Sequence, residues 1–348
     1  MGLYKLLGKL LQKKLPQPKK ISPKKKLLLV NLQGKGDSLM LTPLLTALKK
    51  AEKTVDVLTL SANHQLFQND KNINKVLTFR GVLSTLRTIN KANYDLIFLT
   101  HGAGPKSGLF FRFLKAKHKA CHRYNLGGYW TGFKADIQLE QTPKLHRVEE
   151  NLKLLDALGL KKRKHAYMYT VPVKASAKAR EYWRRHFKKG ETIIGIHPGG
   201  DKANPQKRYP LKKYCELVNN LPKEYKALFF LGPDEDELAT SIRKRCRKEN
   251  YSIYKGDLQT VAALLKRCHI LVHSDSGLGH LAAAVGTRTL TIAGATNWHR
   301  TRPYGGKDRL IKARGCPEPK KTRMEESNIR AEAPPWPSSQ QVLKEAMR

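Results

Sequence analysis

The first residues that could do chemistry form a glycine turn, Gln33-Gly34-Lys35-Gly36-Asp37, which follows an apolar run. Two glycines between a strand and a helix let a ligand approach the backbone closely, and Gly36 is therefore a candidate binding residue. The turn has neither the Lys-Ser/Thr pair of a Walker loop nor the GxGxxG spacing of a dinucleotide site. Asp37 is a candidate general base that takes a proton from an acceptor hydroxyl. The alternative is an N-cap, and one residue can fill both roles.

A second candidate site lies between residues 268 and 297. An apolar run typical of a buried strand ends at Ser274, and small residues follow where a helix opens. Exposed amides and the helix dipole at such an N-terminus predict a pyrophosphate site. Asp275 would repel phosphate, so its expected role is to accept hydrogen bonds from sugar hydroxyls, with a helix cap as the alternative. His280 could donate to a phosphate, although a single His is more often a satisfied structural group.

A third candidate combines residues 196–200 (IHPGG) with a polar loop that ends in Lys207-Arg208. Lys207 could stabilise the charge that develops on a leaving diphosphate, or it could face solvent. The acidic run at residues 234–237 (DEDE) suggests a metal site. Acids in the first turn of a helix also favour the helix dipole, and we expect that structural role and no metal or cofactor. One of these acids is also a candidate contact for a nucleotide ribose.

Two successive series of strands and helices must position these segments. Short continuous apolar runs are typical of parallel strands covered on both faces. Strands are predicted at residues 26–32, 55–60, 76–79, 94–100, 192–197, 227–231, 252–255, 270–273 and 289–293. Helices are predicted at residues 38–50, 146–158, 211–221, 235–248, 258–266 and 278–285. Part of 103–142 is expected to be irregular, and Gly159 is expected to terminate the helix before it.

The alternation predicts an α/β protein with two Rossmann-like, doubly wound domains that face each other across a cleft. The predicted boundaries are 26–165 for the N-terminal domain and 166–330 for the C-terminal one, with a tail helix in 331–348. Residues 1–25 form a separate basic segment. Its leucines recur at helical spacing between lysines, which predicts either an amphipathic helix at a membrane interface or a solvated tail.

Composition restricts the partners. The chain of 348 residues has 67 Lys and Arg against 28 Asp and Glu, a net charge of +39, which implies a polyanionic partner. The five cysteines form no CxxC pair, as is typical of reduced thiols in a cytosolic protein. No apolar run reaches the roughly 18 residues that span a bilayer.

Several of these segments, in their order, resemble the ADP-heptose:lipopolysaccharide heptosyltransferases, and the similarity covers most of residues 26–306. The resemblance implies the glycosyltransferase B fold. The matching segments are Gly36-Asp37 with Leu41-Thr42-Pro43-Leu44 and Ala47-Leu48; Ile196-His197-Pro198-Gly199; Lys207-Arg208-Tyr209-Pro210; Asp275-Ser276-Gly277-Leu278-Gly279-His280-Leu281-Ala282-Ala283-Ala284; and Gly294-Ala295-Thr296-Asn297 with Arg302-Pro303-Tyr304-Gly305.

The resemblance implies a role for each matching position. Asp37 takes the position of the catalytic base, Lys207 that of the lysine near the donor phosphates, and Asp275 that of the acid that contacts the donor sugar. The diphosphate loop corresponds to Gly277–His280. The implied donor-side residues are Ser276, Gly277, Leu278, Gly279, His280 and Thr296. The chain departs from the family in having Asn31 in place of a common Arg, and Thr296-Asn297-Trp298 in place of Thr-Asp-Pro.

The resemblance thus implies an inverting, metal-independent transferase that moves heptose from an ADP-sugar donor to lipid A–core. Such an enzyme would work at the cytoplasmic face of the inner membrane, bound peripherally to its anionic surface. A transferase of the same fold with another sugar nucleotide or a protein acceptor is the alternative. A nucleic-acid-binding protein is a third possibility that the charge favours. The basic residues of this chain are however spread along it, and no aromatic-rich recognition motif accompanies them. We therefore expect no specific nucleic-acid partner.

Overall fold

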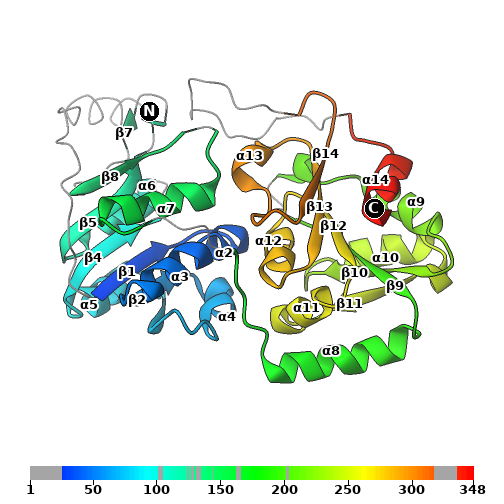
Figure 1. Ribbon diagram of the computed structural model, residues 1–348, viewed down its shortest axis with the longest axis horizontal. Coiled ribbons are helices and arrows are strands. Elements are labelled where there is room, and N and C mark those ends of the chain that lie inside the picture. Colours follow the sequence, from blue (N-terminus) through cyan, green and yellow to red (C-terminus); the bar gives the residue numbers. More distant parts are fainter. Residues whose placement is uncertain are drawn as a thin grey trace. The chain divides into compact units, whose positions relative to one another are not determined.

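The computed structural model describes residues 26–100, 105–123, 125–126, 129–130, 135–142, 144–161, 166–200, 204–316 and 335–348 (Figure 1). The described chain divides into two compact units, of which the first ends at Ala166 and the second begins at Tyr167. Each unit contains one six-stranded parallel sheet with helices in the connections. The predicted fold class, α/β with two Rossmann-like units, is confirmed.

The N-terminal sheet has the strand order β3-β2-β1-β4-β5-β8. Its strands are β1 (Lys26–Asn31), β2 (Thr54–Thr59), β3 (Lys75–Thr78), β4 (Tyr94–Leu99), β5 (Ala116–Arg123) and β8 (Ile137–Glu140), and a separate antiparallel pair consists of β6 (Asn125–Leu126) and β7 (Tyr129–Trp130). The apolar strand β1 pairs with both β2 and β4, so the chain reverses its direction across the sheet beside β1. This reversal places the turn after β1 where open α/β sheets bind ligands.

The helices of this unit are α2 (Lys35–Leu39), α3 (Thr42–Lys50), α4 (His64–Phe67), α5 (Val82–Asn90), α6 (Pro105–Phe113) and α7 (Arg147–Ala157), with a short 3-10 turn η1 (Ser61–Asn63).

The prediction of a single helix at 38–50 is wrong. Pro43 cannot continue α2, because its ring would clash with the carbonyl of Leu39. Thr42 Oγ1 donates to that carbonyl at 2.9 Å, and a second helix starts there. Helices α5 and α6 and strand β5 were not predicted from the sequence. Gly159 follows α7 with φ +67°, as predicted for a terminating glycine.

The C-terminal sheet has the order β11-β10-β9-β12-β13-β14. Its strands are β9 (Thr192–His197), β10 (Tyr225–Leu231), β11 (Tyr251–Lys255), β12 (Ile270–Ser274), β13 (Arg288–Ala293) and β14 (Asp308–Lys312). Its helices are α8 (Val173–His186), α9 (Leu211–Asn219), α10 (Asp236–Arg245), α11 (Leu258–Leu265), α12 (Gly277–Ala284), α13 (Trp298–Thr301) and α14 (Ser339–Met347), with 3-10 turns η2 (Pro205–Lys207) and η3 (Lys248–Asn250). The reversal falls between β9 and β12, and α8 and β14 were not predicted.

Helix α14 packs on α9 and completes the core of the C-terminal unit. Val342 and Ala346 are fully buried against residues of α9 and the sheet. The helix begins with a capping box, in which Ser338 and Gln341 exchange side-chain and backbone hydrogen bonds. The final helix predicted from the sequence is therefore part of this unit's core.

No helix in the described ranges is long and apolar enough to cross a membrane.

Candidate active site

The Asp37 carboxylate does not cap a helix. Gly34 occupies the N-cap position of α2 and Asp37 lies in the first turn, with no side-chain cap hydrogen bond. Arg147 Nη1 donates to Asp37 Oδ1 at 2.5 Å. Arg147 is the first residue of α7, which packs against α3 and so brings this guanidinium to the turn. Each of the two side chains is about one-fifth exposed, so the pair is oriented but still open to solvent.

A buried amide holds the glycine turn in place. Asn31, 2% exposed, ends β1 and accepts hydrogen bonds through Oδ1 from Ser38 Oγ at 3.2 Å and from the Gln33 amide at 3.3 Å. Its Nδ2 group donates to Thr100 Oγ1 at 3.3 Å and to the Asp37 carbonyl at 3.4 Å. Position 31, where the chain departs from the family pattern, therefore links the ends of two strands to the first turn of α2.

Lys207 lies beside Asp275 in the C-terminal unit. Lys207 Nζ is 4.0 Å from Asp275 Oδ2, and their side chains are only 17% and 18% exposed. The amide of Tyr209 donates to Ser274 Oγ at 2.8 Å, which ties the loop of Lys207 to the end of β12. Lys207 is therefore not a solvent-facing loop residue.

The first turn of α12 lacks the side-chain cap that the sequence offered as the alternative role of Asp275. Ser276, not Asp275, is the N-cap residue, and it makes no side-chain cap hydrogen bond. The buried Ser276 Oγ has no hydrogen-bond partner among the described residues. Gly277 and Leu278 are half-buried at this turn. The arrangement leaves a hydroxyl and first-turn amides at the end of β12, as an anion site requires.

The other two residues of the predicted diphosphate loop have structural roles. His280 is 3% exposed, and its Nδ1 lies 3.0 Å from the hydroxyl of Tyr167. A Cβ atom on Gly279 would lie 2.0 Å from Cε1 of His273, so only glycine fits against this ring. His273 was not predicted as a site residue, because no local sequence pattern shows that a strand residue contacts the following helix.

His273 belongs to a buried polar chain. Its Nδ1 donates to the carbonyl of Ser274, and its Nε2 lies 3.2 Å from Thr291 Oγ1. Thr291 and Thr289 donate to Asp308 Oδ1, each at 2.8 Å. Burial lowers the pKa of His273 to about 4 and raises the pKa of Asp308 to about 6. The imidazole is therefore neutral near pH 7 and acts as a rigid spacer beneath α12.

Glu235 faces the glycine pair that follows β9. Its Oε2 accepts from the Gly232 amide at 2.7 Å, and a Cβ atom on Gly199 would lie 2.0 Å from its Oε1. Asp236, the next acid, forms an ion pair with Lys255 at 2.6 Å. Among the described residues no group of three or more His, Cys, Asp or Glu side chains could hold a metal ion.

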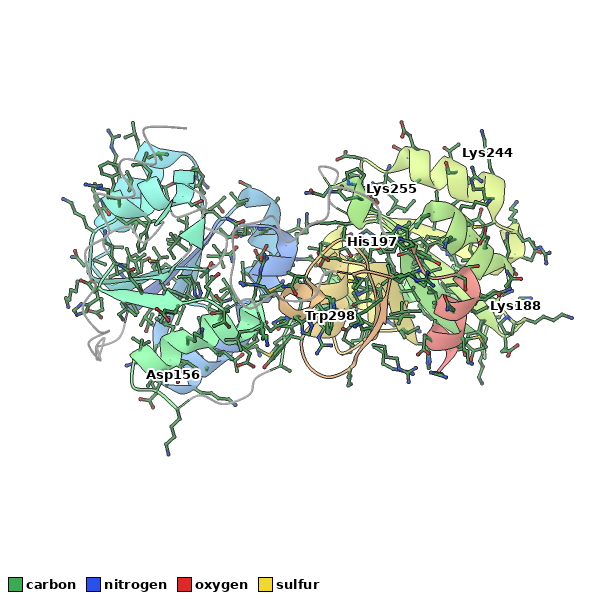
Figure 2. The ribbon with its side chains drawn as sticks, turned by 90° about the horizontal axis from the view of Figure 1, so that it is seen from above. Asp156, Lys188, His197, Lys244, Lys255 and Trp298 are labelled. Carbon is green, nitrogen blue, oxygen red and sulfur yellow. The ribbon has the colours of Figure 1, made fainter. Side chains whose placement is uncertain are left out.

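His197 ends the central strand β9 and is half-buried. Figure 2 shows it near the middle of the C-terminal unit in this view, whereas Lys188 and Lys244 extend from its edge. Its Nδ1 donates to the Phe230 carbonyl at 3.0 Å, and burial lowers its pKa. The imidazole is therefore held against the end of β10.

The loop after β13 holds Thr296, which is 4% exposed. Trp298 follows at the start of α13, and two cations lie near its ring, with the Arg302 guanidinium 5.3 Å and Lys312 Nζ 5.2 Å from the ring centroid. This stacked cluster occupies the position at which the chain departs from the family's Thr-Asp-Pro.

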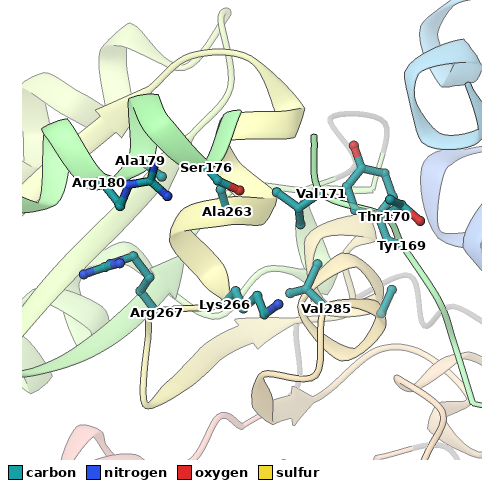
Figure 3. Close-up of a pocket in the computed structure, with 11 residues that line it drawn as sticks. Tyr169, Thr170, Val171, Ser176, Ala179, Arg180, Ala263, Lys266, Arg267 and Val285 are labelled. Carbon is teal, nitrogen blue, oxygen red and sulfur yellow. The ribbon is translucent and has the colours of Figure 1, made fainter. Parts of the chain in front are cut away.

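A cavity of about 440 Å³ lies elsewhere in this unit, between α8, α11 and the end of α12 (Figure 3). Three exposed cations line it, Arg180, Lys266 and Arg267, together with small and apolar residues. It borders the last residues of α12, at the end of the helix remote from Gly277. None of the predicted site residues lines this cavity.

The fold of the two units is that of the B-fold class of glycosyltransferases. A glycosyltransferase family 9 structure from Veillonella parvula superposes with a TM-score of 0.78 at 18% identity, covering 94% of this chain and 97% of that one. The structure titled E. coli heptosyltransferase WaaC with ADP gives a TM-score of 0.67 at 19% identity, covering 92% and 99%. Lipopolysaccharide heptosyltransferase 3 of Escherichia coli K12 is 25% identical over 292 residues, 77% of this chain and 82% of that protein.

Residues 82–330 match the family model described as glycosyltransferase family 9 (heptosyltransferase). The chain belongs to this family, and it is a glycosyltransferase.

Gly279→Ala should weaken donor binding, because the new methyl group must displace either the His273 ring or the first turn of α12. Overpacking of this kind typically costs about 1–3 kcal/mol of stability. The double variant Gly279→Ala/His273→Ala should recover much of both losses, because it removes the clashing ring. ADP binding by calorimetry and thermal unfolding would test this. Additive effects in the double variant would show that the contact between these residues does not position the loop.

Proposed function

We propose that the chain is an inverting glycosyltransferase that moves heptose, or a related sugar, from an ADP-sugar donor to the lipopolysaccharide core. The observation that carries the proposal is the Asp37 carboxylate, which lies at the turn after the central strand, is oriented by Arg147 and is not used as a cap. The similar E. coli structure determined with ADP and the relative named lipopolysaccharide heptosyltransferase support the donor and acceptor classes.

In the proposed mechanism Asp37 takes the proton from the acceptor hydroxyl as its oxygen attacks the anomeric carbon of the donor sugar. The bond from that carbon to the diphosphate oxygen breaks as the new bond forms on the opposite face, so configuration inverts. Lys207 and the first-turn amides of α12 stabilise the negative charge on the departing ADP. Asp275 holds Lys207 nearby and accepts hydrogen bonds from donor-sugar hydroxyls. We propose that no metal or cofactor takes part.

The proposed acceptor is lipid A–core, whose phosphates suit a chain of net charge +39. This acceptor leads us to propose a cytoplasmic protein bound peripherally to the anionic surface of the inner membrane. The N-terminal segment, residues 1–25, lies outside the described residues, so its predicted helix remains a prediction. No specific nucleic-acid partner is proposed.

A second candidate is a transferase of the same fold with another sugar nucleotide or a protein acceptor. It is favoured by one observation, the Trp298 cluster with Arg302 and Lys312. Indole and cationic side chains in place of Thr-Asp-Pro change what the loop after β13 can contact. Donor specificity is therefore the part of the proposal that most needs measurement.

The direct test is a donor screen with purified protein and truncated core glycolipids, read by mass spectrometry. The expected product is the glycolipid plus one heptose from an ADP-heptose donor, formed equally well with and without EDTA. Transfer from UDP- or GDP-sugars only would replace the proposed donor. Loss of transfer in EDTA, restored by magnesium or manganese, would contradict the metal-free mechanism.

Asp37→Asn should reduce turnover by about 10² to 10⁴-fold, because the amide cannot accept the hydroxyl proton. Donor affinity should change little, since the residue acts on the acceptor. Asp156→Asn is the matched control, because it makes the same chemical change at an exposed position on α7 in the same unit. Single-turnover rates and ADP titrations separate these effects. An Asp37→Asn enzyme with more than about a tenth of wild-type turnover is incompatible with a general base.

Lys207→Ala should reduce kcat more than it weakens donor binding, because its charge is needed most as the diphosphate leaves. The matched control is Lys35→Ala, which removes an exposed lysine from the turn that carries Asp37. Steady-state kinetics with ADP-sugar at saturating acceptor gives both parameters. Equal losses in the two variants would argue that Lys207 contributes only to the general positive field.

A further inference from the structure

Exposed apolar side chains are concentrated on two helices of the N-terminal unit. Six large apolar residues are exposed in the described parts of the chain, and four of them lie on α5 and α6. These four are Val82 at 48%, Leu83 at 72%, Leu109 at 56% and Phe113 at 55% exposure. Single exposed apolar residues are ordinary on a soluble protein, but such a concentration on two helices needs a reason.

The two helices cover the same face of the N-terminal sheet. Ile89 of α5 and Phe110 of α6 pack into one core cluster with Leu28 of β1, and Phe79 meets the Phe110 ring edge-on. Their C-terminal ends are joined, because Asn90 Nδ2 donates to the Phe113 carbonyl at 3.1 Å. The outer sides of these two helices, which adjoin at their C-terminal ends over one core, are together called the α5–α6 face.

Cations and no acids accompany these apolar residues. Neither helix contains an Asp or Glu residue. Arg87 and Arg112 are exposed on the two helices, and three further exposed cations stand at their ends, Arg80, Lys91 and Lys115. Leucine and phenylalanine interspersed with arginine and lysine is the pattern of a surface that lies in a membrane interface. Two copies of such a face would repel each other, which disfavours self-association.

We propose that the α5–α6 face is the surface by which the N-terminal unit rests on an anionic lipid bilayer. Leu83, Leu109 and Phe113 enter the boundary between headgroups and acyl chains, and the arginines and lysines meet the lipid phosphates. This inference rests on the proposed function, in which the acceptor is borne by a membrane. It assigns the contact to the folded unit, independently of residues 1–25.

The first experiment places a polarity-sensitive fluorophore on the face through Leu109→Cys. All five native cysteines are buried, so a thiol-reactive dye labels the introduced residue. The control is Val173→Cys, an 83% exposed apolar position on α8 of the other unit. Vesicles of phosphatidylglycerol and phosphatidylethanolamine at physiological salt should shift the emission at position 109 to the blue. The shift should be smaller at position 173 and absent with phosphatidylcholine alone.

The second experiment compares vesicle partitioning of the full chain and two variants. Leu83→Ser/Leu109→Ser/Phe113→Ser should lower the partition coefficient by roughly tenfold or more, because these chains no longer enter the interface. Arg87→Gln/Arg112→Gln should lower it roughly fivefold per residue on anionic vesicles, and less at high salt. Melting temperatures should stay near that of the wild type, because the side chains are exposed.

Unchanged partitioning of both variants, or vesicle binding without a shift at position 109, would overturn the proposal. Dimers that form with the wild type and disappear with the triple substitution would instead assign the face to an interface between copies of the chain. Transfer to a short, soluble acceptor should be unaffected by the triple substitution. If no donor supports transfer at all, the proposed function fails, whereas the fluorescence shift still tests the bilayer contact.

Discussion

The buried amide of Asn31 is the interaction on which the turn that carries Asp37 depends. It accepts from the turn and from Ser38, and it donates to Thr100 and to the Asp37 carbonyl. A buried amide costs free energy unless its donors and acceptors are satisfied, so this arrangement permits few alternatives. The position of Asp37 follows from it, because the carboxylate lies within the first turn that Asn31 holds. Arg147 then sets the direction of the carboxylate itself.

In the C-terminal unit, a buried imidazole supports the start of a helix, as Asn31 does in the N-terminal unit. His273 lies in β12, contacts the next helix where Gly279 leaves room, and connects through Thr291 to Asp308. Its low pKa keeps the ring uncharged near pH 7, so it adds no charge of its own beneath the proposed diphosphate site. In both units a polar residue buried at the end of a strand supports a helix N-terminus, and the reactive groups project from that support. Rigid support of this kind keeps catalytic groups within the small tolerance that transfer reactions allow.

The charge of the chain serves two different purposes in this description. A few cations are specific, such as Arg147 beside Asp37 and Lys207 beside Asp275, and these are largely shielded from solvent. Most others are exposed and give the protein a general attraction to polyanions. On the α5–α6 face they accompany apolar side chains, and that combination distinguishes a bilayer from a soluble polyanion as the partner.

The sequence alone determined the alternation of strands and helices, the two-unit α/β class and the segments that carry chemistry. Those features are local, because apolar runs, glycines and first-turn residues are read within a few positions. It did not show that Pro43 separates α2 from α3, nor did it show the helices α5, α6 and α8.

Only the tertiary structure decided which side chains contact the candidate site residues. The sequence left Asp37 and Asp275 as either caps or reactive groups, and the folded chain brings Arg147 and Lys207 to them across 110 and 68 positions. Gly279, a predicted residue of the diphosphate loop, also leaves room for the ring of His273. Such contacts depend on how helices pack against strands that are distant in sequence, and no local pattern of residues encodes that distance or direction.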